Sequence, residues 1–236
     1  MKMSHHYALV IGDGRMSEDK LTKRALIFDF DGLILDTETA EVRIWHDLYA
    51  QVGLTFDMDA YIGVVGSNGS RDHDPAQALA DREGEKRSFT QIRNDFRQLA
   101  YRHVEVLEPL PGVVNLINTA KAKGYLLAVG SSAAYSWVHT HLTRLGLADN
   151  FDVIVTFDDV ENAKPSPDIF LKVLERLDIS AENALVFEDS QNGVLAAHRA
   201  GIRAIAIPNP ITIIQDFPLA TSVVPSLEGF DPDEYF

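Results

Sequence analysis

Two aspartates stand one residue apart at the end of an apolar run, in the segment LIFDFDG at residues 26–32. Carboxylates as close in sequence as Asp29 and Asp31 repel each other and raise each other's pKa. A chain that needed only a turn at this point would be served by one aspartate or by an asparagine. The pair therefore predicts that a positive group lies between the two side chains.

Polar side chains follow the other apolar runs of the chain in the same way. Together with the aspartate pair they supply four carboxylates, one ammonium group and two hydroxyls: Asp29, Asp31, Glu188, Asp189, Lys164, Ser131 and Ser132. If the runs are parallel strands, the residues beyond their carboxyl ends meet at one edge of the sheet, where such sheets bind ligands. We therefore expect these side chains to converge on a single site.

The chemistry of these donors indicates which cation the site would hold. All of them are hard oxygens, and carboxylates, a backbone carbonyl and water favour Mg²⁺ over zinc or copper. The eight histidines show no spacing that joins them, and His139 and His141, two residues apart, diverge on a helix. Mg²⁺ beside a lysine and the backbone amides near Ser131 would suit a phosphate dianion.

A purely structural interpretation of the same residues is also open. Short oxygen side chains accept hydrogen bonds from the first N–H groups of a helix, and four residues could act in this way: Asp31, Ser131, Ser166 and Asp189. Lys164, which precedes a proline, could be a solvated loop lysine. Capping needs only one oxygen per helix, however, and it explains neither Asp29 nor the adjacent Glu188. Four carboxylates packed together without a cation would be strongly unfavourable.

The elements that would position these residues alternate between short apolar runs and longer amphipathic stretches. Continuous apolar runs suit strands that are covered on both faces, and we predict six strands, at 25–28, 126–129, 153–155, 184–187, 204–207 and 223–224. Helical patterns occupy 113–123, 134–145, 168–177 and 192–200. The alternation predicts an α/β fold in which a Rossmann-like parallel sheet lies between layers of helices.

One segment interrupts this alternation, because residues 37–107 contain no convincing strand. Apolar residues at helical spacing form two stripes there, namely Ile44, Trp45, Leu48, Tyr49 and Val52, then Ile92, Phe96, Leu99 and Val106. We therefore predict a small helical cap domain at 37–107, inserted into a core made of 24–36 and 108–236, with hinges at 32–35 and 108–112. Residues 1–23 form an N-terminal arm without an assigned function, whose segment 7–11 could add an edge strand.

Composition limits the partners that the protein can have. With 35 acidic against 21 basic residues, the chain of 236 residues carries a net charge of −14, which repels nucleic acid and anionic lipid. It contains no cysteine, so disulfides, thiolate catalysis and Cys-ligated metal sites are excluded. No apolar stretch approaches the roughly 20 residues of a membrane span. We expect a cytoplasmic protein, monomer or weak dimer, with no nucleic-acid or membrane partner.

Four segments of the chain occur in an order that is known from one superfamily. They are DFDGLILDT at 29–37, LLAVGSS at 126–132, KPSPDIF at 164–170 and VFEDSQNG at 186–193. These segments resemble the four ordered motifs of the haloacid dehalogenase superfamily. With its helical insertion, the chain is most similar to the branch that holds β-phosphoglucomutase, phosphoglycolate phosphatase and small sugar-phosphate phosphatases.

The resemblance implies a role for each residue of the expected site. Asp29 would attack phosphorus and form an aspartyl-phosphate, while Asp31 would protonate the leaving alcohol and later take a proton from the attacking water. Ser131, the amide of Ser132 and Lys164 would stabilise the phosphoryl group during transfer. Mg²⁺ would have four protein ligands, which are the Asp29 carboxylate, the Asp31 carbonyl, Glu188 and Asp189.

The resemblance also assigns the choice of substrate to the cap. The expected substrate contacts are Ser132, Thr37, Glu41 and Arg71, the last in the loop GVVGSNGSR at 63–71. Mutases of the β-phosphoglucomutase type carry a histidine four residues after the threonine, where this chain has Glu41. They also carry polar or basic residues after the serine of the second motif, where this chain has Ala133, Ala134 and Tyr135. A mutase must grip a second phosphate, and cationic side chains are the usual means.

We therefore predict a Mg²⁺-dependent phosphatase that hydrolyses small phosphorylated metabolites, namely sugar, polyol or hydroxyacid phosphates. The first alternative is a β-phosphoglucomutase-like phosphosugar mutase. The second is a non-catalytic phosphate-binding module like a receiver domain, which also combines an acidic pocket, a hydroxyl residue and a lysine. Receivers have no helical insertion after the first strand and no need of Asp31 as an acid. The dehalogenases of the superfamily lack the second aspartate and the metal.

Overall fold

A computed structural model describes residues 23–67, 74–84 and 86–236 of the chain. Two predictions concern residues that lie outside these ranges. One is the N-terminal arm, of which only Lys23 is described, including the edge strand suggested for 7–11. The other is the substrate contact expected from Arg71.

Six parallel strands form one sheet in the order β3-β2-β1-β4-β5-β6. The strands are β1 (Ala25–Phe28), β2 (Leu126–Gly130), β3 (Val153–Val155), β4 (Ala184–Glu188), β5 (Arg203–Ala206) and β6 (Ser222–Val223). Because β1 pairs with both β2 and β4, it lies in the middle of the sheet. The predicted fold class is confirmed, and each predicted strand agrees with an observed one to within one residue at either end.

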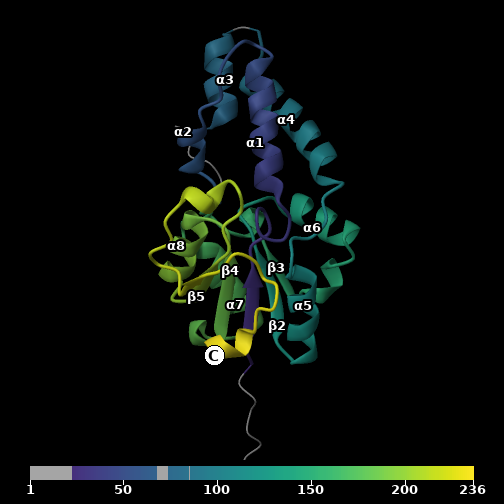
Figure 1. The fold of residues 1–236 in the computed structure, drawn as a ribbon, viewed down its shortest axis with the longest axis vertical. Coiled ribbons are helices and arrows are strands. Elements are labelled where there is room, and N and C mark those ends of the chain that lie inside the picture. Colours follow the sequence, from purple (N-terminus) through teal and green to yellow (C-terminus); the bar gives the residue numbers. More distant parts are fainter. Residues whose placement is uncertain (1–22, 68–73, 85) are drawn as a thin grey trace, which may run out of the picture.

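Helices cover both faces of this sheet, as Figure 1 shows. They are α5 (Val113–Ala122) and α6 (Tyr135–Arg144) on one face, and α7 (Asp168–Leu177) and α8 (Gln191–Arg199) on the other. Side chains of a strand point alternately to opposite faces. Leu26 and Phe28 accordingly pack with α5 and α6, whereas Ala25 and Ile27 pack with α7 and α8. All four are fully buried, which is why the run is apolar throughout.

The chain between β1 and β2 forms a separate group of helices. They are α1 (Thr37–Ala50), α2 (Met58–Ile62), α3 (Pro75–Glu83) and α4 (Phe89–Val104). These helices have a hydrophobic core of their own, in which Trp45 stacks on Phe96 with ring centroids 4.2 Å apart. In Figure 1 they occupy one end of the molecule, and the C-terminus lies near the other. We call this helical group the cap.

Short 3-10 helices complete the connections of the fold: η2 (Ala148–Asn150), η3 (Phe157–Asp159), η4 (Ala181–Asn183), η5 (Thr212–Ile214) and η6 (Pro232–Tyr235). In the described part of the chain, no helix has both the length and the apolar character that a membrane span requires.

Two residues of the predicted cap stripes lie outside the helices. Val52 comes after the end of α1 and is 37% exposed, and Val106 comes after the end of α4 and is 72% exposed. The prediction was wrong for both because helical spacing continues past the point where a helix stops packing. The predicted divergence of the two histidines on α6 is confirmed, since His141 is buried and His139 is exposed.

Candidate active site

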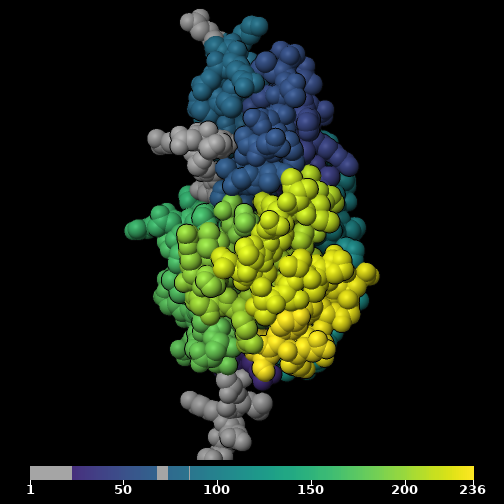
Figure 2. Space-filling model, turned by 60° about the vertical axis from the view of Figure 1, so that its left-hand side comes forward, coloured from purple at the N-terminus to yellow at the C-terminus, as the bar shows by residue number. Residues whose placement is uncertain are grey.

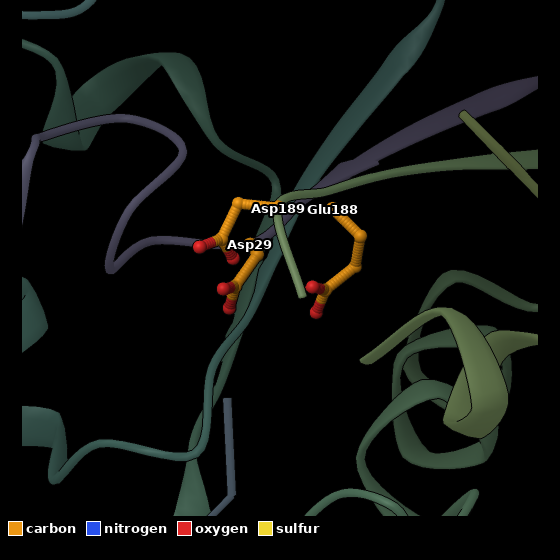
Figure 3. A group of neighbouring side chains, drawn as sticks. All are labelled: Asp29, Glu188 and Asp189. Atoms are coloured by element: carbon orange, nitrogen blue, oxygen red, sulfur yellow. The ribbon is translucent and has the colours of Figure 1, made fainter. Parts of the chain in front are cut away.

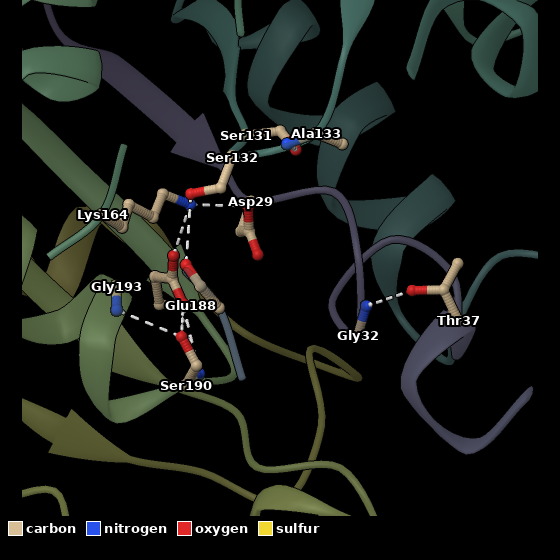
Figure 4. Close-up of polar contacts among 11 residues, drawn as sticks. Asp29, Gly32, Thr37, Ser131, Ser132, Ala133, Lys164, Glu188, Ser190 and Gly193 are labelled. Atoms are coloured by element: carbon tan, nitrogen blue, oxygen red, sulfur yellow. Dashed lines mark hydrogen bonds and ion pairs between the residues drawn. The ribbon is translucent and has the colours of Figure 1, made fainter. Parts of the chain in front are cut away.

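Lys164 lies between two carboxylates at the carboxyl end of the central strands. Its Nζ donates to Asp29 Oδ1 and to Glu188 Oε1, each at 2.6 Å (Figure 4). Asp29 directly follows β1 and Glu188 ends the neighbouring β4, so the pairing of these strands brings the two carboxylates together. All three side chains are buried. The alternative of a solvated loop lysine is therefore wrong for Lys164.

Three buried carboxylates form a cluster beside this lysine. Asp29, Glu188 and Asp189 bring oxygen atoms within 4.8 Å of one another (Figure 3). Asp189 Oδ2 accepts from Asn209 Nδ2 at 2.7 Å, whereas Asp189 Oδ1 is buried without a hydrogen-bond partner in the described residues. A buried polar atom without a partner costs free energy, and a metal ion at this point would supply the partner. The oxygen-only donor set fits Mg²⁺.

In this cluster the negative charge of the carboxylates exceeds the positive charge of Lys164. Burial, and then the neighbouring Glu188 carboxylate, raise the pKa of Asp29 to about 7, although Lys164 lowers it. Burial, followed by Glu188 and Asp29, raises the pKa of Asp189 well above its usual range. Burial alone would lower the pKa of Lys164, but Asp29 and Glu188 raise it above its ordinary value. The lysine is therefore protonated, and the charge of the cluster would still favour a further cation.

The start of α8 fixes the orientation of Glu188. Glu188 Oε2 accepts from the backbone N–H of Ser190 at 3.1 Å and from its Oγ at 3.0 Å. Ser190 is also the N-cap of α8, because its Oγ accepts from the Gly193 N–H (Figure 4). A Cβ atom at Gly193 would lie only 1.8 Å from Glu188 Oε1. The carboxylate therefore occupies space that exists only because residue 193 is a glycine.

Asp31 lies near the cluster but makes different contacts. Its Oδ1 accepts from the indole Nε1–H of Trp137 at 2.9 Å. Burial raises the pKa of Asp31, while hydrogen bonds with Trp137 and then Thr37 lower it. Thr37 is fully buried and its Oγ1 accepts from the Gly32 N–H at 3.1 Å (Figure 4). This bond ties Thr37 to the loop after β1, and the substrate contact expected from Thr37 stays a prediction.

The two serines after β2 also have different partners. Ser131 is buried, and its Oγ accepts from the Ala133 N–H at 3.0 Å. Ser132 Oγ donates to the carbonyl of Gly66 in the cap at 3.2 Å. Ser132 thus links the core to the cap beside Asp29.

The observed N-caps of the helices do not support the interpretation of the polar residues as helix caps. The side chains that cap α1 and α8 are those of Asp36 and Ser190. At α6 and α7 the N-cap residues are Ala134 and Pro167, which make no side-chain capping bond. None of the four residues considered for this role is the N-cap of a described helix: Asp31, Ser131, Ser166 and Asp189. The carboxylate of Asp189 is buried and that of Asp31 is partly exposed, and neither of them caps a described helix.

Comparison with known proteins shows to which family the chain belongs. A sequence model described as "Haloacid dehalogenase-like hydrolase" matches residues 26–207, a range that includes the Asp29, Ser131, Lys164 and Glu188 segments. The chain belongs to the haloacid dehalogenase-like hydrolase family. The family prediction, and with it the prediction of an enzyme of the phosphoric monoester hydrolase class, is confirmed.

Individual relatives of this haloacid dehalogenase-like hydrolase agree with that assignment. The chain is 38% identical over 189 residues to "Putative phosphatase YhcW" of Bacillus subtilis (strain 168), covering 80% of this chain and 85% of the relative. It is 32% identical to the fructose-1-phosphate phosphatase YqaB of Escherichia coli (strain K12), covering 77% and 95%. The crystal structure titled "putative beta-phosphoglucomutase from Thermotoga maritima" has a TM-score of 0.69 and 30% identity, covering 85% of this chain and 94% of that chain.

In this haloacid dehalogenase-like hydrolase, a cavity of about 650 Å³ connects Asp29 and Asp31 with the cap. Glu41, predicted as a substrate contact, lines the cavity, and so do Glu38 and Tyr61. The Tyr61 hydroxyl lies 3.1 Å from both Glu38 Oε2 and Glu41 Oε2. Burial, followed by Glu41, raises the pKa of Glu38 well above its ordinary value, and burial, followed by Asp31, raises that of Glu41 to about 7.

Several residues of this site were not found from the sequence. Glu38 directly follows Thr37 and no sequence pattern distinguishes it, and Tyr61 comes from a five-residue helix with little periodic signal. Arg93 and Arg97 line the cavity from α4, one turn apart, a spacing that in isolation is equally typical of a solvated helix face. Asn209 follows β5 and faces Asp189. A polar residue beyond the carboxyl end of another strand was the one signal that could have identified it.

Proposed function

We propose that the protein is a Mg²⁺-dependent phosphatase that hydrolyses small phosphorylated metabolites through an aspartyl-phosphate intermediate. The observation that supports this most directly is the buried arrangement of Lys164 between Asp29 and Glu188, beside an Asp189 oxygen that has no hydrogen-bond partner among the described residues. The arrangement opens into a cavity large enough for a phosphorylated sugar. A nucleophile, a fixed positive charge and a place for a metal thus lie at one end of a substrate-sized space.

Asp29 and Asp31 would divide the chemistry between them. The Asp29 carboxylate would attack phosphorus, which splits one difficult displacement into two easier ones. Asp31 would give a proton to the leaving alcohol and then take one from the water that hydrolyses the intermediate. Asp29 accepts from Lys164, whereas Asp31 accepts from Trp137. Their different environments suit a nucleophile and an acid.

The remaining residues would stabilise the phosphoryl group and hold the metal. Ser131, the amide of Ser132 and Lys164 would face the phosphoryl oxygens, where charge increases during transfer. The protein ligands of Mg²⁺ would be the Asp29 carboxylate, the Asp31 carbonyl, Glu188 and Asp189. When bound, the ion would supply positive charge that polarises the phosphoryl group.

The cap side of the cavity favours a hydroxyl-rich leaving group. Glu38 and Glu41 each present one oxygen to Tyr61, and their second oxygens make no hydrogen bond with the described residues. Hydroxyls of a sugar or polyol can donate to such oxygens, whereas a carboxylate or a second phosphate would be repelled. Sugar and polyol monophosphates are therefore our first choice of substrate class, before hydroxyacid phosphates.

A phosphosugar mutase is the second candidate, and one observation favours it. Arg93 and Arg97 line the cavity, so the cap has cationic side chains that the sequence did not reveal and that could grip a second phosphate. Arg93 lies 3.6 Å from Asp74, however, and Glu38 and Glu41 also face the cavity. Hydrolysis remains the better-supported reaction because these three carboxylates offset the charge of the arginines.

The test is release of phosphate from a panel of monophosphates, with isomerised sugar phosphate measured in the same samples. We expect free phosphate in the presence of Mg²⁺, loss of activity with a chelator, and recovery when Mg²⁺ is restored. Asp29→Asn should reduce turnover by at least ~10³-fold with an unchanged circular dichroism spectrum, because the amide is similar in size but cannot form the acyl phosphate.

Four results would contradict the proposal. Full activity in chelator would refute the metal site, and activity of Asp29→Asn within tenfold of wild type would refute the nucleophile. The mutase would be the better-supported function if β-glucose 1-phosphate were converted to glucose 6-phosphate faster than any monophosphate released phosphate. A chain that turns over no phosphate ester at all would favour a binding module.

A further inference from the structure

The hydrogen bond between Trp137 and Asp31 has a fixed donor, unlike the other contacts of Asp31. An indole N–H can only donate, so Asp31 Oδ1, at 2.9 Å from Trp137 Nε1, must be an accepting oxygen. The hydroxyls of Thr37 and Ser131 also interact with this carboxyl group, but hydroxyls can rotate and either donate or accept. The carbonyl oxygen of a carboxylic acid accepts more strongly than its hydroxyl oxygen does, so the indole at Oδ1 favours Oδ2 as the oxygen that carries the proton when Asp31 is protonated.

Trp137 also lies where the core and the cap meet. Its side chain packs against the hydrophobic cluster of the sheet and against the separate cluster of the cap. The indole forms an edge-to-face contact with Tyr101 of α4, with ring centroids 4.9 Å apart, and another with His141 of its own helix at 4.4 Å. The ring is therefore held by packing on two sides while its N–H points at Asp31.

We propose that Trp137 is a positioning residue that sets Asp31 Oδ2 as the proton donor to the leaving group when the cap rests on the core. The inference depends on the proposed phosphatase function. In the step concerned, an Asp29 oxygen forms a bond to phosphorus and the bond from phosphorus to the substrate oxygen breaks. The electron pair of the broken bond stays on that oxygen, which takes the Oδ2 proton and leaves as a neutral alcohol, while Asp31 becomes a carboxylate.

This role affects substrates unequally. The alkoxide of a sugar or polyol is a poor leaving group, so it needs the proton during bond cleavage. The 4-nitrophenolate ion is stable without a proton, so its ester needs the acid much less. Loss of the Trp137 N–H should consequently slow the first class of substrate and spare the second. A residue that only supported the fold would affect both classes equally.

The experiment compares kcat/KM for fructose 1-phosphate and for 4-nitrophenyl phosphate, with Mg²⁺ present. Trp137 is replaced by 3-benzothienylalanine, in which sulfur takes the place of the N–H at nearly constant shape, and separately by Phe. Tyr135→Phe is the matched control, because this exposed residue lies on the same helix. For kcat/KM the relevant step is formation of the aspartyl-phosphate, which excludes the later role of Asp31 as a base.

We expect both Trp137 variants to lower kcat/KM for fructose 1-phosphate by about tenfold to a hundredfold, and that for 4-nitrophenyl phosphate by less than about threefold. Tyr135→Phe should leave both values unchanged. An equal loss with both substrates, or no loss with the benzothienyl variant, would overturn the inference while leaving the phosphatase assignment intact. If the wild-type protein released phosphate from neither ester, the proposed function would fail and this inference with it.

Discussion

At the scale of single residues, the site depends on one glycine as much as on its charged groups. The Glu188 carboxylate occupies the space beside Gly193, where any Cβ atom would lie within 2 Å of it, and from this place it reaches Lys164 at 2.6 Å. Glycine inside a helix normally costs about 1 kcal/mol relative to alanine. Its presence in the first turn of α8 is therefore explained by the carboxylate, not by the helix.

Gly193→Ala should accordingly damage the site and destabilise the protein, although alanine is the better helix former. The added Cβ would displace Glu188 and break its bond to Lys164, and a displacement of about 1 Å in a catalytic arrangement costs on the order of a hundredfold in rate. We expect a loss of that size in phosphate release, and a lower melting temperature. Gly63→Ala is the control, because the nearest atom to its Cβ would be 3.6 Å away; equal behaviour of the two variants would refute the argument.

The residues that the sequence could identify are those whose positions follow from strand ends. Asp29 directly follows β1 and Glu188 ends the neighbouring β4, so predicting the strands also predicted that these carboxylates meet. Trp137 and Tyr61 come from helices, where the direction of a side chain depends on how the helix packs. No local pattern marks an indole that points at a carboxylate. Their roles became visible only with the tertiary structure.

At the scale of elements, the contact between α1 and α2 brings two carboxyl groups together, which costs electrostatic free energy. Glu38 and Glu41 occupy the first turns of α1, and both lie against the Tyr61 hydroxyl of α2. Burial, and then Asp31, raise the pKa of Glu41 from its usual 4.5 to about 7. The folded chain therefore holds this proton more tightly than the unfolded chain does. The pair therefore does not stabilise the cap above pH 7, which is consistent with the substrate contact that we propose for Glu41.

The sign of this shift predicts how stability depends on pH. Since the folded state binds more protons, the free energy of unfolding falls as the pH rises from about 4.5 to about 7. One pKa unit corresponds to about 1.4 kcal/mol, and the partial exposure of Glu41 reduces the total to about 1–2 kcal/mol. Glu41→Gln should remove this loss, because the amide stays neutral and can still accept from Tyr61.

Thermal melts at pH 5 and pH 8 would measure the effect. We expect Glu41→Gln to raise the melting temperature at pH 8 and to leave it nearly unchanged at pH 5. The matched control is Glu161→Gln, because Glu161 is exposed and makes no hydrogen bond or ion pair within the described residues. A variant that is no more stable than wild type at pH 8 would contradict the assignment.

The elements themselves were more predictable in the core than in the cap. Core strands are short, apolar throughout and followed by amphipathic helices, so both periods appear in the sequence. The cap helices α2 and α3 are short and partly exposed, and their bounds depend on the N-caps Asp57 and Asp74 and on packing against α1 and α4. Sequence patterns therefore predicted the cap as a helical insertion without giving all of its helices.

At the scale of the whole molecule, the cap rests on the core through a few directed hydrogen bonds. The segment 62–66, which begins at the last residue of α2, supplies carbonyl groups, and the core supplies the donors. Asn192 Nδ2 donates to the Val65 carbonyl at 2.8 Å, and Gln215 Nε2 donates to the Ile62 carbonyl at 3.0 Å. Figure 2 shows this side of the molecule, with the blue cap residues resting on the yellow and green residues of the core. We propose that residues 37–107 move as one body about 32–35 and 108–112, and that these bonds favour the seated position.

The last prediction concerns the equilibrium between a seated and a raised cap. Two hydrogen bonds contribute about 1–3 kcal/mol together, which corresponds to a change of roughly 5-fold to 150-fold in the ratio of the two positions. We therefore expect the double variant Asn192→Ala/Gln215→Ala to have a larger radius of gyration in solution scattering than the wild-type protein.

Mg²⁺ with a metallofluoride mimic of the phosphoryl group should reduce that radius in both proteins, because closure excludes water and completes the site. The double variant should need more of the mimic to reach the same compact state, and its KM should rise more than its kcat falls. Asn183→Ala removes a core amide whose side chain bonds only Ser180 among the described residues, and this variant should behave as wild type. Scattering profiles that are identical in all three proteins, with and without the mimic, would show that the cap does not move and that access to Asp29 is controlled in another way.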